Sequence, residues 1–131
     1  MRYLGIDYGE KRIGLAVSDP DGKIAFPKKI IFNHGRRKVL KELNLLLHEE
    51  KISKIIVGLP LYLDGSESGE SRQVRAFAEE LKKEVHLPVE FENEMLTTHI
   101  VEMAGVPREH TDQAAAALIL QSYLDKHQSE P

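Results

Sequence analysis

Three acidic residues from separate parts of the chain have the types and positions that phosphate chemistry requires. Asp7 lies in an apolar, β-prone segment, Glu94 follows a segment of alternating apolar and acidic residues, and Asp112 opens an alanine-rich segment. Each falls where a strand or a helix begins or ends, so the three side chains can converge on one point. Such a cluster can hold two Mg²⁺ ions about 4 Å apart, which clamp the attacking and leaving oxygens of a phosphodiester during in-line displacement.

Two of these acids also have explanations that need no ligand. A charge near a sheet interior is costly unless it is paired or bound to a metal. Asp7 is therefore a metal ligand, an acid of a phosphate site, or a turn residue satisfied beside Gly9. Asp112 falls in the first turn of a helix that Thr111 can cap, where the helix dipole alone favours an acid. The residues by themselves leave these alternatives open.

The first acid is positioned by a predicted meander of three strands. Residues 3–6 and 13–17 are rich in apolar and β-branched side chains and predict two strands. The DPDG sequence at 19–22 has Pro and Gly at the second and fourth positions of a type I turn. The second strand should therefore fold back into a third at about 23–32, antiparallel to it.

The remaining elements alternate between helix and strand. Apolar residues at helical spacing predict an amphipathic helix over 36–50, with a basic start that faces water, and another over about 74–85. The segment 52–59 predicts a central strand covered on both faces, and 89–94 predicts the last strand. With the helix that begins near residue 111, the expected order is βββαβαβα.

Four segments resemble the YqgF (RuvX) family over nearly the whole chain. They are GIDYGEKRIGLAVSD at 5–19, IIVGLPLYLDG at 55–65, NEMLTT at 93–98 and DQAAAALILQSYLD at 112–125. That family is similar to the RuvC-type Holliday-junction resolvases, and is described as a resolvase or as the nuclease that finishes the 5′ end of small-subunit ribosomal RNA. The resemblance implies an α/β, ribonuclease H-like fold with a mixed five-stranded sheet, helices on both faces, and one domain over 1–131.

The resemblance also implies roles for single residues. Asp7 matches the acid of the first strand, Glu94 the acid of the family's DERLTT element, and Asp112 the acid that opens the last helix. These three are the expected catalytic residues and the expected ligands of Mg²⁺ or Mn²⁺. This chain has Asn93 and Met95 where the family usually has Asp and Arg, which removes one negative and one positive charge beside the expected site.

The overall charge of −3 gives little support to nucleic-acid binding, because phosphate contacts are normally made by an excess of Lys and Arg. Local clusters must supply the positive charge. Lys11 and Arg12, after the turn that follows the first strand, are the expected phosphate contacts. The basic clusters at 28–29 and 36–41 are more simply explained as solvated surfaces.

A long connection at 60–70 leaves the carboxyl end of the central strand, where ligands of open α/β sheets usually bind. Its Gly and Ser content predicts a mobile substrate clamp. Tyr62 within it is the expected contact to a base. Asp64 is better explained as part of an Asp-Gly turn, since that dipeptide needs no site to account for it.

Length and composition predict one compact domain of 131 residues, with 41% hydrophobic and 30% charged residues and no cysteine. No apolar run approaches a membrane span and the first strand begins at once, so we expect a cytoplasmic location and no membrane partner. The expected partner is nucleic acid, either an rRNA precursor or branched DNA. We expect a monomer or a weak homodimer, because a junction that is cut symmetrically needs two active sites.

Three functions compete for these residues. The first is a metal-dependent nuclease. The second is a non-catalytic nucleic-acid-binding factor of ribosome maturation with a degraded site, which Asn93 and Met95 would allow. The third is a sugar-kinase or actin-like ATPase with Asp7 in its first phosphate loop, but such an ATPase closes two similar domains on its nucleotide and this chain supplies one. We expect the nuclease.

Overall fold

The computed structural model of the chain describes residues 1–62, 64–93 and 111–127, with the backbone alone at 111–113. Its elements follow the predicted order βββαβαβα. They are β1 (Arg2–Asp7), β2 (Arg12–Ser18), β3 (Ala25–Phe32), α1 (Arg36–Glu49), β4 (Ile52–Leu59), α2 (Gly69–Glu84), β5 (Val89–Asn93) and α4 (Thr111–His127).

The strands form one mixed sheet with the order β3-β2-β1-β4-β5. Tight connections make β1, β2 and β3 antiparallel, whereas the crossovers through α1 and α2 return β4 and β5 parallel to β1. The carboxyl ends of β1, β4 and β5 therefore lie at one edge of the sheet. This arrangement confirms the predicted mixed five-stranded sheet.

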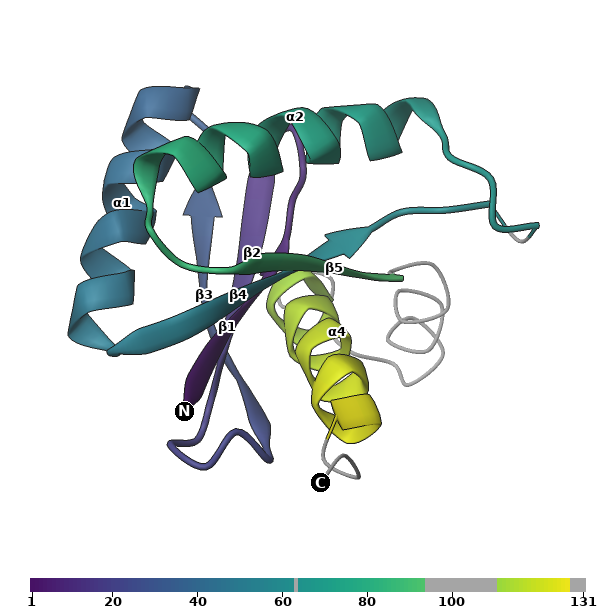
Figure 1. Cartoon of the computed structure of the whole chain (residues 1–131). Helices are drawn as coiled ribbons and strands as arrows, with labels where there is room; N and C mark the ends of the chain where they lie inside the picture. The colour runs from purple at the N-terminus through teal and green to yellow at the C-terminus, as the bar shows by residue number, and fades with distance from the viewer. Residues whose placement is uncertain (63, 94–110, 128–131) are drawn as a thin grey trace.

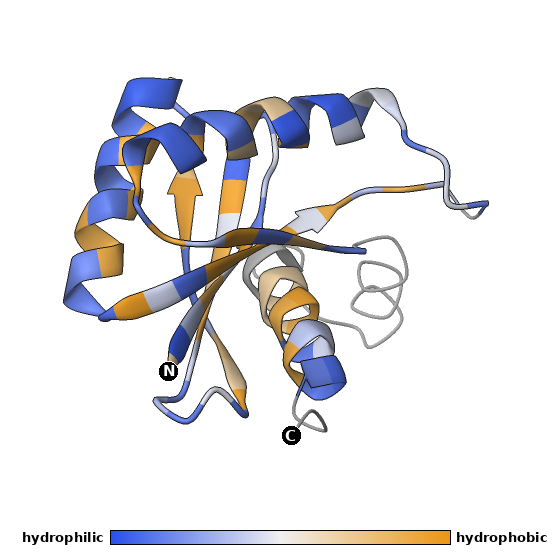
Figure 2. Cartoon of the chain, in the orientation of Figure 1, coloured by the Kyte–Doolittle hydropathy of each residue, from blue (hydrophilic) through white to orange (hydrophobic). Residues whose placement is uncertain are grey.

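Side-chain alternation divides the core into two layers on opposite faces of the sheet. Leu4 and Ile6 of β1 pack against the buried faces of α1 and α2. Ala16 of β2 and Ile56 of β4 pack on the other face against α4. Figure 1 shows α1 and α2 on one side of the sheet and α4 on the other. In Figure 2 the hydrophobic colour concentrates on the strands, while the outer surfaces of α1 and α2 are hydrophilic.

Helix α4 lies unusually close to β1. A Cβ built at Gly5 would stand 2.8 Å from Leu120 Cβ and 2.9 Å from the carbonyl oxygen of Ala116. Ala116 at this contact is fully buried, as is its neighbour Ala115. The small side chains on this side of α4 allow the close approach.

The start of α1 differs in part from its prediction as a solvated basic surface. Arg37 and Lys38 are exposed as expected. In contrast, the guanidinium group of Arg36 forms an ion pair with Glu80 of α2, with 3.1 Å between Arg36 Nη1 and Glu80 Oε2. Arg36 Cζ also lies over the ring of Phe77, 5.5 Å from its centroid. The prediction was wrong for Arg36 because its partners come from another helix, which a local pattern does not reveal. Within the described ranges, no helix is both long enough and apolar enough to cross a bilayer.

Candidate active site

Asp7 is the last residue of β1 and is half-buried. Because Ile6 packs into the core under α1 and α2, alternation turns Asp7 to the face that carries α4. Asp7 pairs with Gly14 of β2, and continuing the register of Ile6 with Val57 places Gly58 of β4 on its other side. Neither glycine has a side chain that could cover the carboxylate. Asp7 therefore lies at the carboxyl end of the middle strand of the sheet, and its neighbours on both adjacent strands have no side chain.

Helix α4 runs antiparallel to β1 across this face. Its residues Ala116 and Leu120 lie over Gly5. Further toward the end of the helix, the ring of Tyr123 lies 6.1 Å from the ring of Tyr3. Moving forward along α4 thus moves backward along β1, so the start of the helix lies toward the end of the strand that carries Asp7.

The spacing of the two elements brings residue 112 to the level of Asp7. Residue 112 lies one turn before Ala116, which is about 6 Å along the helix. Asp7 lies two residues beyond Gly5, which is about 6.6 Å along the strand. The side chain of Asp112 and the whole of Glu94 lie outside the described residues, so the convergence of the three acids stays a prediction.

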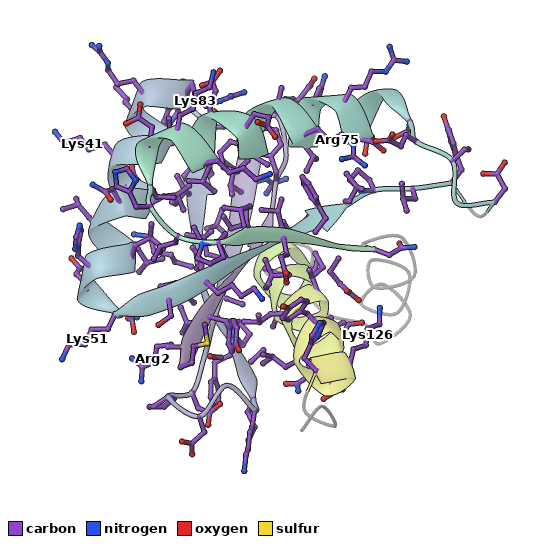
Figure 3. The ribbon with its side chains drawn as sticks, viewed as in Figure 1. Arg2, Lys41, Lys51, Arg75, Lys83 and Lys126 are labelled. Atoms are coloured by element: carbon purple, nitrogen blue, oxygen red, sulfur yellow. The ribbon has the colours of Figure 1, made fainter. Side chains whose placement is uncertain are left out.

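Strand β5 places Glu92 on the same face as Asp7. The register of β4 with β5 pairs Gly58 with Glu92, so Asp7 and Glu92 share one row across the sheet with a glycine between them. Glu92 is buried, and its Oε2 accepts hydrogen bonds from Ser122 Oγ at 2.8 Å and Lys126 Nζ at 2.6 Å. Lys126, labelled in Figure 3, extends from α4. Helix α4 therefore compensates the charge of Glu92 and is anchored by it.

A second anchor lies one row away. Glu90 Oε2 accepts hydrogen bonds from the Tyr123 hydroxyl and, at 2.9 Å, from Lys54 Nζ. These bonds, the one from Tyr123 first, hold the pKa of Glu90 below its usual value. His127 stacks on Tyr123 with ring centroids 4.0 Å apart. Sequence reasoning noted the alternating acids of this strand but missed their anchoring role.

One sequence signal could have suggested this role. The polar residues Ser122 and Lys126 are four apart on a predicted helix and therefore lie on one side of it. The acids of the strand alternate with apolar residues and therefore lie on one face of the strand. What the pattern lacks is the pairing of the two elements. In the part of the chain that the structure describes, no three His, Cys, Asp or Glu side chains are grouped to hold a metal ion.

The two cations after the first turn occupy different places. Arg12 begins β2 two residues before Gly14, so alternation puts it on the α4 face. Lys11 lines a hollow of about 410 Å³ beside α2, together with Glu10 and Glu70. With two acidic residues and one basic residue in its lining, that hollow is a poor phosphate site. Arg12 is therefore better placed than Lys11 to meet a nucleic acid that reaches Asp7.

The described cations outside this turn come from several elements of the fold. Figure 3 shows this for the labelled residues Arg2, Lys41, Lys51, Arg75, Lys83 and Lys126. Several of them are committed to ion pairs, as in the contacts of Arg2 with Glu50 and of Arg75 with Glu67. A binding surface must therefore be local, as the net charge already indicated.

The connection before α2 projects away from the body of the molecule (Figure 1). Tyr62 within it is 58% exposed. Asp64 Oδ1 accepts hydrogen bonds from Ser66 Oγ at 2.6 Å and Ser66 N at 2.9 Å, and these bonds hold the pKa of Asp64 below its usual value. Gly65 has a φ of 85°, which glycine adopts readily. The Asp-Gly turn is thus confirmed, and Tyr62 is presented at its start.

Comparison with known proteins gives matches over nearly the full length. The family model described as "RuvX: Holliday junction resolvase" matches residues 1–126. The chain is 42% identical over 137 residues to a protein of Nitratidesulfovibrio vulgaris, and the alignment covers 98% of this chain and 96% of the relative. It is 39% identical over 132 residues to a protein of Maridesulfovibrio salexigens, with 95% and 98% covered. Both relatives carry the name "Putative pre-16S rRNA nuclease".

Solved structures with the same arrangement include Holliday-junction resolvases. RuvC of Thermus thermophilus in complex with a Holliday junction substrate matches with a TM-score of 0.64 and 14% identity, covering 98% of this chain and 97% of that one. The fowlpox virus Holliday junction resolvase matches with a TM-score of 0.61 and 12% identity, covering 96% and 99%. At these identities the likeness concerns the fold, and it confirms the expected ribonuclease H-like architecture.

Proposed function

This chain belongs to the RuvX family, and from that premise we propose that it is a metal-dependent nuclease that hydrolyses phosphodiester bonds in nucleic acid. The names of its relatives favour pre-16S rRNA as the substrate over the Holliday-junction DNA that the family description names, and we propose the 5′ end of that RNA as the site of cleavage. The observation that carries the proposal is the position of Asp7 at the end of a central strand, between two glycines. Asp7 lies on the face of the sheet that α4 covers, near the start of that helix.

The proposed site has the donors that a hard cation requires. Asp7, Glu94 and Asp112 would hold Mg²⁺ or Mn²⁺, because both ions prefer carboxylate oxygens. When bound, such ions polarise the phosphate and lower the pKa of a bound water. The chain itself contributes position: β1 holds Asp7 at the sheet edge, and the anchors from Glu90 and Glu92 hold α4 against the sheet. This rigidity favours catalysis, since in-line displacement depends on exact placement of the reacting groups.

The alternative of a degraded, non-catalytic site rests on Asn93 and Met95. Asn93 pairs with Leu59, which is buried in the core under α1 and α2. Alternation thus puts residue 93 on the face opposite Asp7. An Asp at this position would add no charge on the face of Asp7, so its absence from this chain does not argue against catalysis. Met95 lies outside the described residues.

The test is cleavage by the purified protein and its Asp7→Asn variant. The substrates are a pre-16S rRNA fragment with its 5′ extension, an unstructured RNA and a four-way DNA junction, each with Mg²⁺, Mn²⁺ or a chelator. We expect metal-dependent cleavage of the rRNA fragment by the wild type and none by Asp7→Asn. The variant should melt at the same temperature or higher, because neutralising one of several crowded carboxylates relieves repulsion.

Asp19→Asn is the matched control for loss of one carboxylate. Asp19 lies in the β2–β3 turn at the opposite end of the sheet, where its Oδ1 accepts hydrogen bonds from the backbone of Lys23 and Ile24. An Asn can still accept these bonds, so cleavage should be unchanged. Equal cleavage by wild type and Asp7→Asn would eliminate the proposed site.

We further propose one cytoplasmic domain over 1–131 that acts as a monomer, or as a weak homodimer, on RNA. Trimming of a single 5′ end needs one active site, whereas symmetric cleavage of a junction needs two related by a two-fold axis. The products of the junction arm of the assay, resolved on a gel, distinguish these two modes.

A further inference from the structure

Phe32, the last residue of β3, exposes 59% of its surface to solvent. A single exposed apolar side chain is common in proteins and needs no explanation by itself. The surroundings of Phe32 are what distinguish it. Its ring stacks with that of His34, with centroids 6.3 Å apart and planes inclined by 29°. Across the sheet it pairs with Arg12 of β2.

The segment that carries these rings is fixed to the turn after β1. The backbone N–H of Asn33 donates to the carbonyl oxygen of Lys11 at 2.9 Å, and its Nδ2 donates to that of Gly9 at 3.2 Å. Asn33 Nδ2 also lies 3.4 Å from the hydroxyl of Tyr8. The two rings are therefore attached to the same turn that closes the strand of Asp7, and the spacing between rings and acid is set by backbone hydrogen bonds.

Phe32 and Asp7 share one face of the sheet. Ile13 and Ile31 are paired and pack under α1 and α2, so their neighbours Arg12 and Phe32 face the other way, toward α4 and Asp7. From Asp7 to Phe32 the path crosses two strand spacings and two residues along a strand, which is about 12 Å. Stacked nucleotides rise about 3.4 Å each, so three or four of them span this distance.

We propose that Phe32 and His34 form a stacking platform for an unpaired nucleobase of the substrate strand, three or four nucleotides from the bond held at Asp7, with Arg12 beside it for the intervening phosphate. The inference rests on the proposed nucleic-acid function of this face. Proteins that bind single-stranded nucleic acids combine aromatic rings with cations, because every base has a π-face that can stack and every phosphate carries a negative charge. The platform selects a single-stranded segment, since a paired base cannot reach the rings.

The test is binding without cleavage, measured in chelator with a set of single-stranded 12-nucleotide RNAs that each carry one 2-aminopurine at a different position. Phe32→Leu should weaken binding by at least about fivefold, the lower limit expected for loss of one base–aromatic stack. It should also abolish the quenching of 2-aminopurine at one position of the strand. The salt dependence of binding should not change, because no charge is removed. Phe32→Trp should retain the affinity and the quenching.

Phe26→Leu is the matched control. Phe26 lies on the same strand and is 49% exposed, but it pairs with Val17 at the other end of the sheet, away from Asp7. Binding by this variant should equal that of the wild type. A strand with an abasic site at the quenched position should bind wild type and Phe32→Leu equally, since the ring then has no base to stack on.

Several outcomes would overturn the platform. The first is that Phe32→Leu binds the RNA as tightly as Phe26→Leu does. The second is that Phe32→Leu loses as much affinity for the abasic strand as for the intact strand. A dimer of the wild type that Phe32→Leu converts to monomer in sedimentation, with binding unchanged, would make this surface a self-association contact instead. Cleavage reports on the proposed function separately: cleavage with no effect of Phe32→Leu on binding refutes the platform alone. A specific binding loss without cleavage by the wild type refutes the nuclease and supports the platform.

Discussion

Replacing Gly5 by Ala should damage the contact that places α4, although it adds only one methyl group. The new Cβ would stand 2.8 Å from Leu120 Cβ and 2.9 Å from the carbonyl oxygen of Ala116. Neither contact is with the end of a flexible side chain. The methyl group can therefore be accommodated only if helix and sheet move apart.

The size of the effect follows from two opposing contributions. Overpacking a tight core typically costs about 1 to 3 kcal/mol. Replacing Gly by Ala also restricts the unfolded chain, which favours folding by about 0.4 to 1 kcal/mol. Because both contacts are shorter than 3.0 Å, the overpacking cost should lie in the upper part of its range, about 2 to 3 kcal/mol, and the net loss in the free energy of unfolding is then about 1 to 2.6 kcal/mol. For a chain of this length that lowers Tm by roughly 3 to 8 °C.

Gly5→Ala should also lower the rate of cleavage by the molecules that remain folded. A shift of α4 away from β1 carries residue 112 away from Asp7, and small displacements of catalytic groups lower rates by orders of magnitude. We expect cleavage to fall by at least about tenfold at a temperature where the variant is fully folded. Circular dichroism melting and the rRNA cleavage assay measure the two quantities on one preparation.

Gly69→Ala is the control for the same chemical change. Gly69 is the first residue of α2, and a Cβ there meets nothing within 4 Å. Its Tm should stay level or rise slightly, and its cleavage should not change. A Gly5→Ala protein that melts at or above the wild type, with full activity, would refute the reasoning that α4 is positioned by direct contact with the β1 backbone.

Three further outcomes test the electrostatics of the molecule. Arg12→Ala should reduce the slope of log affinity against log salt by up to about 0.7 to 0.9, the value for one phosphate contact, because Arg12 lies on the face of Asp7. Lys11→Ala should reduce it by less, because Lys11 lines a hollow together with Glu10 and Glu70, and equal losses would place both cations on the phosphate path. Asn93→Asp should leave the Mg²⁺ concentration for half-maximal cleavage unchanged, since residue 93 lies on the face opposite Asp7, and a lower midpoint would contradict that placement. Glu90→Gln should flatten the acid side of the plot of Tm against pH. The folded-state pKa of Glu90 lies below its usual 4.5, so its stabilising contribution is present above pH 4.5 and is lost as the pH falls below it. An equally steep acid decline in both proteins would exclude this contribution.

The sequence by itself determined the elements and their order. The apolar run at 55–57 and the helical spacing of Val39, Leu43 and Leu46 predicted a central strand and an amphipathic helix, and both are present. The Asp-Gly turn was equally readable at Asp64. These features are local, because side-chain periodicity and turn chemistry act between residues a few positions apart.

The tertiary structure decided which faces and partners those elements use. In the sequence, alternation alone predicts that Glu90 and Glu92 lie on the face of β5 opposite Phe91. Only the pairing of β5 with β4 shows that this face is the one under α4, where the two acids bind Tyr123, Ser122 and Lys126. The pairing of Phe32 with Arg12 likewise depends on register between strands. Such contacts join residues far apart in the chain, and a local pattern carries no information about them. Asp7 was identified as an acid at a strand end from the sequence, but its position between two glycines and below the start of α4 is a property of the sheet.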